Sequence, residues 1–584
     1  MSKLVYICFN NKKLENKLGS RKVFEIMSDR LVPGNITPHP VRVIREDGIA
    51  VGIINPAKSV ITHGPSVCLG VMMKPCTKWY QPMSPVPDGN YALVRGDDTT
   101  IEVVTDIVAS RTLWYYYDED IFIASTSQRA IVMLMGSVSF NQEAVSWMLS
   151  SGLLGYGNAW DTRIKKLKGD SRIVLDRRSW EVTIYETPVR FEPADMPVKK
   201  AVPRMREVYE DTFTRLNLEP EQWLMALSGG RDSRLVFLLL QDKLNLKCVS
   251  WGMKNALHDT LNDAHIAKEL AARYGYEFIF REVETKEAFI EDSLTRFLMS
   301  GEGRIDNIGP YMDAFDSWKF FFEMDVRGMF RGDQGYYQAA IVNEDHGRKM
   351  GSMKLLQDYK EYPDIAQFGF APQEIHDELG KKKHESLVSY SYRFHHMYRI
   401  PHTTAAWNDL VSSYIEVINP LLTRNIIYEI RRLPDHLLFK NKLHNAVVES
   451  ITPDIHFAKR SAIEPLSDVL YNKHLVKYLC EQLAGDNDRE ILPGEFLDLV
   501  LAQVRSYDGT GAGLVRTIPV YLINTFKKMI SDKKKQKLSA YIKNHFEYNK
   551  IALRCFIVIK MYTILHADAK ALETVLKENV SIQH

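Results

Sequence analysis

The sequence predicts an α/β protein: a β-sandwich part comes first, a parallel sheet flanked by helices follows, and a helical part ends the chain. Three observations support this order. Short β-branched and aromatic runs alternate with turn signals up to about residue 188. Apolar strands and helical segments alternate from about residue 202, which is typical of a parallel sheet. From about residue 381 onward, helical patterns dominate.

The first part contains several short runs with the composition of strands. We expect strands over residues 91–94, 101–105 and 121–124, because each run is apolar or β-branched and turn residues separate them. A helix is expected over 127–135. Residues 189–198 contain Pro, Glu and Asp, which indicates a linker to the second part.

The second part repeats a strand–helix unit. We expect helices over 202–216, 234–240 and 261–274, and strands over 223–227, 248–251 and 277–281. Units of this size favour a parallel sheet with helices on both faces. Ligands of such sheets bind outside the carboxyl ends of the strands, so the residues just after each strand are the first candidates for a site.

The composition is that of an ordinary globular protein. At roughly 100–200 residues per domain, the 584 residues suggest two to four domains. The net charge of +2 and the lack of a long apolar run argue against nucleic acid and membrane as partners. The six scattered cysteines lack zinc spacing, and no signal peptide is evident. These features predict reduced thiols and a cytoplasmic location.

One motif carries the chemistry: Ser228-Gly229-Gly230-Arg231-Asp232-Ser233, where a strand ends and a helix begins. Two glycines let the backbone bring N–H groups close to oxyanions, and a helix start adds free donors and a positive dipole end. Asp232 would repel phosphate unless magnesium lay between them, which makes it a candidate metal ligand. The alternative is an ordinary serine- and glycine-rich turn. The motif lacks the Gly-Lys-Ser/Thr of a Walker loop.

This motif resembles the signature of the N-type, or PP-loop, ATP pyrophosphatases, in particular the asparagine synthetase-like group with asparagine synthetase B, β-lactam synthetase and lasso peptide cyclases. Asp333, in Gly332-Asp333-Gln334, is similar to the second magnesium-binding aspartate of that family. The resemblance implies Mg²⁺ at Asp232 and Asp333. It implies ATP binding by Leu227, Ser228, Gly229, Gly230, Arg231, Asp232, Ser233, Ser250, Trp251, Gly252, Met253 and Gly332.

The amino-terminal part resembles the glutaminase domain of the same synthetases, which has an Ntn-hydrolase-like fold. Such a glutaminase needs a cysteine directly after the initiator methionine, and this chain has Ser2 there. The resemblance therefore implies a degenerate glutamine amidotransferase-like domain over 1–190. A PP-loop synthetase domain over 200–465 and a helical extension over 466–584 complete the expected organisation.

Further residues are assigned by their place in the family pattern. Lys459 falls where the family has a lysine near the reacting phosphates, with Arg460 as the competing register. Phe330 occupies the position of the family's proton acceptor and cannot move a proton. Tyr336, Tyr337 and Glu374 are the candidate replacements, and water is the alternative. The turn 301–307 is either a contact for the acyl substrate or an exposed loop.

The family logic implies an AMP-forming amide-bond ligase that adenylates a carboxylate and lets an amine displace AMP. The first hypothesis is ring closure within one substrate, as in a β-lactam or a lasso peptide macrolactam. A lasso cyclase would act on a peptide carboxylate and need a partner that delivers or processes the precursor. The second hypothesis is amidation of a small acid or glycan by a separate amine or ammonia. The third is an inactive scaffold homologue.

Overall fold

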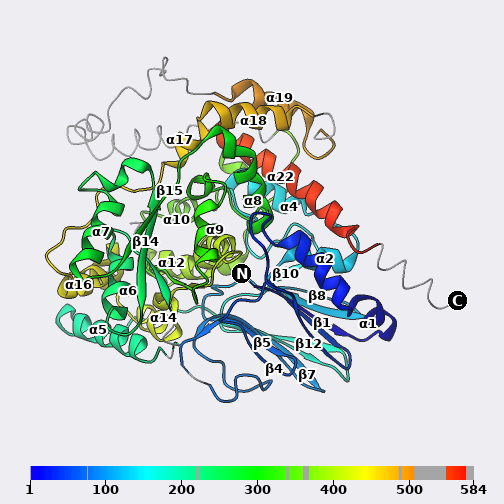
Figure 1. The fold of residues 1–584 in the computed structure, drawn as a ribbon, viewed down its shortest axis with the longest axis horizontal. Coiled ribbons are helices and arrows are strands. Elements are labelled where there is room, and N and C mark those ends of the chain that lie inside the picture. The colour runs from blue at the N-terminus through cyan, green and yellow to red at the C-terminus, as the bar shows by residue number, and fades with distance from the viewer. Residues whose placement is uncertain are drawn as a thin grey trace.

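The computed structural model describes residues 2–74, 76–216, 218, 222–336, 341–359, 367–485, 489–505 and 547–573. Tyr337, one of the candidate bases, lies outside these residues. In Figure 1 the antiparallel strands of the first part lie at the lower right, and the parallel sheet with its helices lies to the left. The α/β class predicted from the sequence is confirmed.

The first part consists of two antiparallel six-stranded sheets, with strand orders β10-β8-β9-β1-β3-β2 and β12-β11-β7-β6-β5-β4. The first sheet comprises β1 (Lys3–Phe9), β2 (Arg42–Glu46), β3 (Ile49–Ile54), β8 (Trp114–Tyr117), β9 (Ile121–Ser125) and β10 (Lys165–Lys166). The second comprises β4 (Ile61–His63), β5 (Ser66–Met72), β6 (Gly89–Gly96), β7 (Thr100–Thr105), β11 (Ser171–Asp176) and β12 (Glu181–Glu186).

Strand β1 shows how these sheets are layered, because all seven of its residues are buried. Successive side chains of a strand point to opposite faces. Leu4, Tyr6 and Cys8 join the apolar core shared with strands of the second sheet. Val5 and Ile7 join a different core that also contains residues of the covering helices. The first sheet is therefore the middle layer between the second sheet and a layer of helices.

Four helices form the outer layer of this part. They are α1 (Lys12–Leu18), α2 (Arg21–Leu31), α3 (Gln128–Met135) and α4 (Gln142–Ser151). Helix α3 starts where the sequence predicts, since the side chain of Ser127 accepts the backbone N–H of Ala130 as an N-cap. It ends at Gly136, which adopts the left-handed conformation that favours glycine.

The second part is built on a five-stranded parallel sheet with the order β15-β14-β13-β16-β17. Its strands are β13 (Trp223–Ala226), β14 (Leu246–Gly252), β15 (Phe278–Glu282), β16 (Met329–Phe330) and β17 (Val417–Ile418). Helices within and beside these units are α5 (Val198–Thr214), α6 (Arg231–Leu240), α7 (Asp263–Arg273), α8 (Ile290–Gly301) and α9 (Asp316–Glu323).

The strand order reverses direction at β13. The chain runs from β13 to β14 and β15 on one side and returns to place β16 and β17 on the other. In open parallel sheets, ligands bind at such a switch point, outside the carboxyl ends of the strands. The two segments that leave this point follow β13 and β16, and they carry Asp232 and Asp333.

The described residues of the rest of the chain are mostly helical. Their longer helices are α10 (Glu344–Met350), α12 (Leu387–Phe394), a π-helix (His395–Thr404), α13 (Ala405–Val411), α14 (Arg424–Arg431), α15 (Asp435–Leu438), α16 (Lys442–Ile451), α17 (Leu466–Leu470), α18 (Lys473–Leu483), α19 (Gly494–Gln503) and α22 (Tyr548–Ala569). Helix α22, red in Figure 1, packs against α3 and α4 of the first part and against α18 and α19.

The turn 301–307 is a buried polar junction, so the alternative of an exposed loop was wrong. Glu302 accepts the backbone N–H of Gln128 in the first part, at 3.0 Å. Arg304 pairs with Asp409 of α13 at 2.5 Å. Asp306 pairs with Arg554 of α22 at 2.7 Å. The three charged residues of this turn are 9% exposed or less. Their charges can be buried because each has a partner in a different part of the chain.

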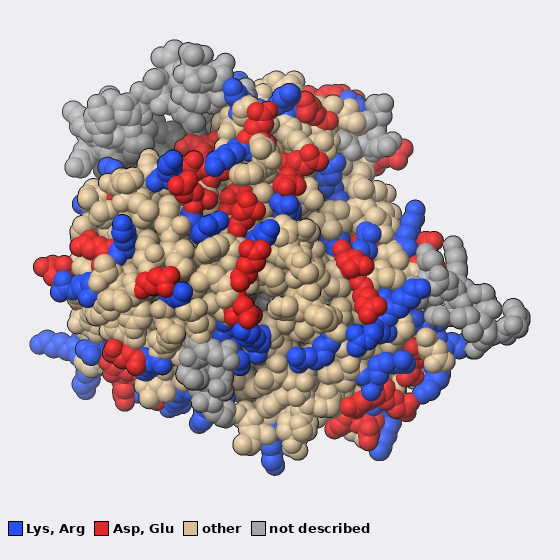
Figure 2. Space-filling view, in the orientation of Figure 1, with Lys and Arg blue, Asp and Glu red and all other residues tan. Residues whose placement is uncertain are grey.

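Two surface features complete the description. Among the described residues, no helix combines the length and the apolar character that crossing a membrane requires. On the face shown in Figure 2, acidic and basic side chains are interspersed over the described part of the chain.

Candidate functional site

The loop after β13 is organised by its own serines. Strand β13 is apolar and mostly buried, and it ends at Ala226. The Ser228 and Ser233 hydroxyl oxygens lie 2.9 Å apart, and Ser233 Oγ also accepts the backbone N–H of Ser228 at 3.1 Å. Ser228 Oγ accepts the N–H of Gly230, the N-cap of α6, also at 3.1 Å. The motif therefore forms a closed turn at the start of a helix, the arrangement expected for anion binding.

This turn opens onto a cavity of about 250 Å³ at the carboxyl edge of the sheet. Its wall comes from residues within 226–233, from Ser250 and Trp251 at the end of β14, and from residues 331–333 after β16. Asp263 and residues 461–463 close the remaining side. The cavity thus lies at the topological switch point, and segments far apart in the sequence share it.

The loop after β16 lies directly against the first turn of α6. A Cβ atom added to Gly332 would stand 2.4 Å from the backbone nitrogen of Ser233, so only glycine fits here without movement. Asp333 follows at once, and its Oδ2 is buried with no hydrogen-bond partner among the described residues. Its Oδ1 lies 3.4 Å from the guanidinium of Arg331, the cationic side chain in the cavity wall.

Both carboxylate oxygens of Asp232 have protein partners. Oδ1 accepts a hydrogen bond from Nε2 of His444, on α16, at 2.7 Å. Oδ2 accepts one from the side-chain amide of Gln334 at 3.1 Å. An ionised carboxylate offers about four lone pairs, so each oxygen retains a site for another ligand. The Asp232 side chain is 27% exposed and lines the cavity.

The segment carrying Lys459 is pinned beside the loop. Arg234 of α6 donates to the carbonyls of Ile455 and His456, at 2.7 and 2.9 Å. The N–H of Ala458 donates to the carbonyl of Gly229, and the N–H of Lys459 to that of Leu261, both at 2.9 Å. These bonds hold residues 455–459 beside the Ser-Gly-Gly loop, directly before the 461–463 segment of the cavity wall.

Asp263 adds a third carboxyl group to the cavity wall. Burial raises the pKa of Asp263 above its usual value, and the backbone N–H of Gly229 opposes that shift by donating to the carboxylate. A carboxylate that accepts the Gly229 N–H helps to hold the glycine turn in shape.

The structure brings most of the predicted nucleotide and metal residues together. Leu227, Ser228, Gly230, Asp232, Ser233, Ser250, Trp251, Gly332 and Asp333 line the one cavity. Gly229, Arg231, Gly252 and Met253 belong to the same segments but do not line it. Gly252 is where the backbone of Ala462 approaches, because an added Cβ would stand 2.3 Å from that carbonyl oxygen.

The predicted catalytic residues are more scattered. Lys459 is exposed and does not line the cavity, although it lies two residues before Ser461 of the cavity wall. Tyr336 is 3% exposed and packs behind the site, with its ring centroid 4.9 Å from that of His444. Glu374 is exposed beside α4, where its backbone N–H donates to Glu143 at 3.1 Å. Phe330 is fully buried and packs against Trp223, with 5.2 Å between the ring centroids.

Several residues of the site were not assigned a role from the sequence. They are Asp263, Gln334, His444 and the 461–463 segment. Gln334 directly follows a predicted ligand, so its position in the motif was a usable signal. No sequence signal pointed to His444, because it comes from a helix more than 200 residues after the loop that it contacts.

The residues fit magnesium bound together with nucleotide better than a metal held by protein alone. Within the described part of the chain, no group of three or more His, Cys, Asp or Glu side chains is placed to hold a metal. Mg²⁺ commonly takes one or two carboxylates together with phosphate oxygens and water. Asp232 and Asp333 supply the two carboxylates, and the unpartnered Oδ2 of Asp333 is the kind of buried atom that a cation would satisfy.

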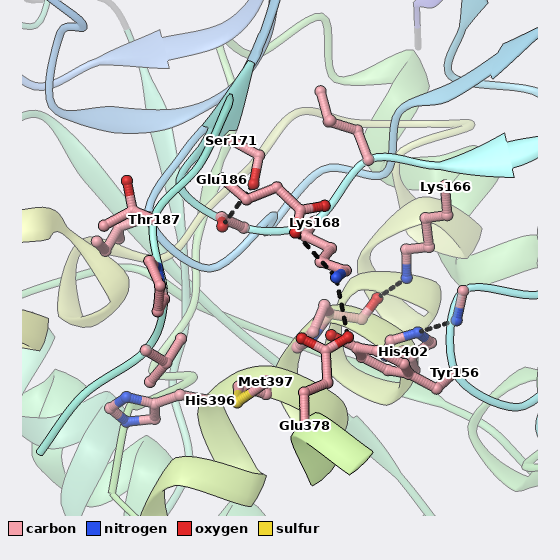
Figure 3. A pocket seen from close by; sticks show the side chains of 17 residues that line it. Tyr156, Lys166, Lys168, Ser171, Glu186, Thr187, Glu378, His396, Met397 and His402 are labelled. Carbon is pink, nitrogen blue, oxygen red and sulfur yellow. Dashed lines mark hydrogen bonds and ion pairs between the residues drawn. The ribbon is translucent and has the colours of Figure 1, made fainter. Parts of the chain in front are cut away.

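A second cavity, of about 120 Å³, lies where the first part meets the helical part (Figure 3). Lys168 bridges Glu186 and Glu378 there, at 3.0 and 2.9 Å. Lys166 donates to the carbonyl of Pro401, and burial holds the pKa of its ammonium well below the usual value. His402 Nε2 accepts the N–H of Gly157 at 3.3 Å. Because protein groups already pair these side chains, we read the cavity as part of the contact between the two parts.

Comparison with known proteins adds little. No family model and no curated protein matches the sequence. A solved glutamine-dependent NAD⁺ synthetase from Acinetobacter baumannii, in complex with ADP, is similar to part of the chain at 16% identity with a TM-score of 0.16. That match covers 29% of this chain and 31% of the synthetase chain. A likeness with so low a TM-score assigns no function.

Proposed function

We propose that this protein is an ATP-dependent, AMP-forming amide-bond ligase. One observation carries the proposal: the Ser-Gly-Gly turn after β13 and the Asp333 loop after β16 open onto a single cavity at the switch point of a parallel sheet. The turn supplies donors for phosphate, and the two loops supply the paired carboxylates that magnesium needs. The loop differs from a Walker loop. Cleavage between the α- and β-phosphates is what the family resemblance implies.

Each part of the cavity then has a task. Backbone N–H groups of the turn, with Ser228 and Ser233, would hold phosphate oxygens. Asp232 and Asp333 would hold magnesium, which supplies positive charge against the phosphates. A substrate carboxylate would attack the α-phosphorus, releasing pyrophosphate and giving an acyl-adenylate. An amine would then attack the activated carbonyl, and AMP would leave. Lys459, two residues before Ser461 of the cavity wall, is the candidate for neutralising charge in these steps.

The site has no side chain at position 330 that could accept the proton of the amine. Phe330 is buried against Trp223, away from the cavity wall. Tyr336 is buried behind His444, and burial raises the pKa of its hydroxyl well above the usual value, which makes it a poor base. Glu374 belongs to a different surface, beside α4. We therefore propose that the amine loses its proton to water.

The finer proposal is ring closure within one substrate, as in macrolactam or β-lactam formation, with a peptide or small carboxylate as substrate. Its support is the first part of the chain, which has a serine in place of the cysteine nucleophile that the family resemblance implies for releasing ammonia. Ser2 is 2% exposed, and its Oγ accepts the N–H of Ala57 at 2.7 Å. A peptide substrate would require a partner that delivers or processes the precursor. Amidation by a separate amine uses the same ATP residues and is the second candidate.

The test is exchange of labelled pyrophosphate into ATP, followed by AMP release, with a panel of carboxylates and carboxyl-terminal peptides. Asp232→Ala and Asp333→Ala are expected to lower the exchange rate by about 100-fold or more, because each removes a ligand of the magnesium that would stabilise the negative charge on the phosphates. Asp498→Ala is the matched control, since Asp498 lies on α19 in an exposed pair with Arg489.

Each outcome separates the hypotheses. Exchange that disappears in both site variants and persists in the control supports adenylation, and a product without added amine supports ring closure. A requirement for added amine or ammonia supports the second candidate. ADP formation contradicts the AMP-forming ligase proposal. Nucleotide binding without any turnover across the panel also contradicts it and favours a scaffold.

A further inference from the structure

Buried side chains form a chain of hydrogen bonds that ends at the Asp232 carboxylate. His444 Nε2 donates to Asp232 Oδ1 at 2.7 Å, and His444 Nδ1 is hydrogen-bonded to the hydroxyl of Tyr209 at 3.0 Å. The His444 side chain is only 1% exposed. Tyr209 lies on α5, His444 on α16 and Asp232 on α6, and these three helices pack against one another. The imidazole is thus fixed on both nitrogens by packed helices.

The other oxygen of Asp232 is held from the opposite loop. Gln334 donates its side-chain amide to Oδ2 at 3.1 Å. Gln334 directly follows Asp333, so one loop supplies both the second carboxylate and a donor to the first. That loop is itself fixed by the π-helix, whose His395 and His396 pair with the carbonyls of Gln334 and Gly335 at 3.4 and 2.6 Å.

These contacts have one common effect, which is to set the orientation of the Asp232 carboxylate. Two donors on different oxygens prevent rotation of the carboxyl group, and each oxygen keeps a lone pair for a cation. Groups that orient the ligands of a metal in this way commonly change its affinity by 10- to 100-fold when they are removed.

We propose that His444 and Gln334 are positioning residues that hold Asp232 in the orientation required for binding magnesium with nucleotide. The inference rests on the proposed function, because it assigns a role to groups behind the same site. Neither His444 nor Gln334 lines the cavity, and His444 lies outside the sequence motif.

The chemistry of the imidazole allows a matched pair of variants. The side-chain nitrogen of glutamine can take the place of the imidazole Nε2, whereas that of asparagine reaches only to the place of Nδ1. His444→Gln therefore keeps a donor for Asp232 and loses the Tyr209 contact. His444→Asn keeps a partner for Tyr209 and loses the Asp232 contact. Gln334→Leu removes the donor to the other oxygen.

The measurement is binding of Mn²⁺ in the presence of ATP, followed by electron paramagnetic resonance on the full chain. Binding of ATP in EDTA, followed by calorimetry, is the parallel readout. His444→Asn and Gln334→Leu are expected to weaken Mn²⁺ binding by about 10- to 100-fold. ATP binding in EDTA is expected to stay within about threefold, and His444→Gln is expected to recover most of the metal affinity.

Three results would overturn the inference. Metal affinity of His444→Asn equal to wild type would show that Asp232 does not depend on the histidine. Equal losses in His444→Asn and His444→Gln would indicate a packing role. If His444→Asn does not fold, Gln334→Leu decides, and an unchanged metal affinity there contradicts the proposal. Wild-type protein that binds neither Mn²⁺ nor ATP would instead overturn the proposed function itself.

Discussion

At the scale of single residues, Gly332 decides how closely the two loops of the site approach. A Cβ atom at this position would stand 2.4 Å from Ser233 N and 2.7 Å from the carbonyl carbon of Asp232. These are backbone atoms of the first turn of α6, which cannot yield as the end of a flexible side chain can. The glycine therefore sets the separation between the Asp333 loop and the helix start that carries Asp232.

Gly332→Ala is expected to force the two loops apart and to weaken Mg-ATP binding by at least about tenfold. The same clash should lower the free energy of unfolding by about 1–3 kcal/mol, the usual cost of overpacking. Calorimetric titration with Mg-ATP and urea unfolding measure the two effects. Gly34→Ala is the matched control, because an added Cβ there meets nothing within 4 Å. Equal nucleotide affinity in both variants would contradict this account.

The sequence predicted the local part of the site and missed its tertiary part. Ser228, Gly230 and Asp232 form a turn whose binding groups all come from one short stretch of the sequence. Asp333 could be added because it occupies a recognisable strand-end motif. The contact between His444 and Asp232 could not be predicted, since it depends on how α16 packs against α6, and neither helix carries a local pattern for it.

At the scale of elements, the π-helix His395–Thr404 is the most unusual feature. A π-helix is rare and often marks a functional site. Its first two residues bind the carbonyls of Gln334 and Gly335, and its His402 accepts the N–H of Gly157 in the first part of the chain. This element therefore connects the Asp333 loop with the contact between the first part and the helical part, shown in Figure 3.

The three histidines of this helix, of which His395 and His396 are buried and His402 is half-buried, should make stability depend on pH. Burial lowers the pKa of His395 to about 3 and holds those of His396 and His402 well below the usual value. In the unfolded chain they titrate near 6.5, so below that pH the unfolded state binds protons that the folded state does not. Stability is full above about pH 6.5 and falls as the pH drops toward 3.

The free energy of unfolding is expected to change by about 1.4 kcal/mol per pH unit for each histidine, or by about 4 kcal/mol per pH unit for the three together. Urea unfolding between pH 5 and pH 8 measures it. Replacing one of these histidines by leucine should reduce this slope by about 1.4 kcal/mol per pH unit, because unfolding then takes up one proton fewer. A slope that none of the three replacements changes would show that these side chains are not buried in their uncharged form.

Elements with a clear local pattern were predicted to within a few residues, whereas the two-residue strands of the parallel sheet were not predicted. The strands over 101–105 and 121–124 and the helix over 127–135 differ from the observed ends by one residue. Helix α6 starts at Arg231 rather than at residue 234, because Gly230 acts as the N-cap directly after the turn. Strands β16 and β17 have two residues each, too few for any periodicity. The pairing of β16 with β13, and of β17 with β16, is a property of the assembled sheet.

At the scale of the whole molecule, α22 ties together parts that are distant in the sequence. Arg554 pairs with Asp306 at 2.7 Å and donates to the carbonyls of Leu149 and Ser150 at 2.9 and 3.0 Å. Asp568 pairs with Arg129 of α3 at 2.6 Å. Both carboxylates of these pairs are buried, so the charges depend on each other for stabilisation.

Arg554→Met is expected to lower the free energy of unfolding by about 3–5 kcal/mol, because it leaves Asp306 buried without its main partner. The double variant Asp306→Asn/Arg554→Met should be more stable than the single one, since the unpaired charge is gone. Urea unfolding followed by tryptophan fluorescence measures both. Lys477→Met, in an exposed pair with Glu481, is the control and should change stability by no more than about 0.5 kcal/mol. A single variant as stable as that control would contradict the expectation.

The position of α22 also bears on how the chain is made. Helix α3 is synthesised roughly 400 residues before the helix that covers it. At translation speeds of about 5–20 residues per second, roughly 20–80 seconds separate the two. Throughout that interval the apolar side of α3 that meets α22 faces water at the ribosome surface. The amino-terminal sheets can form early, but their helical layer stays unfinished until the last described helix emerges, so the nascent protein must pass through a long-lived, partly covered state.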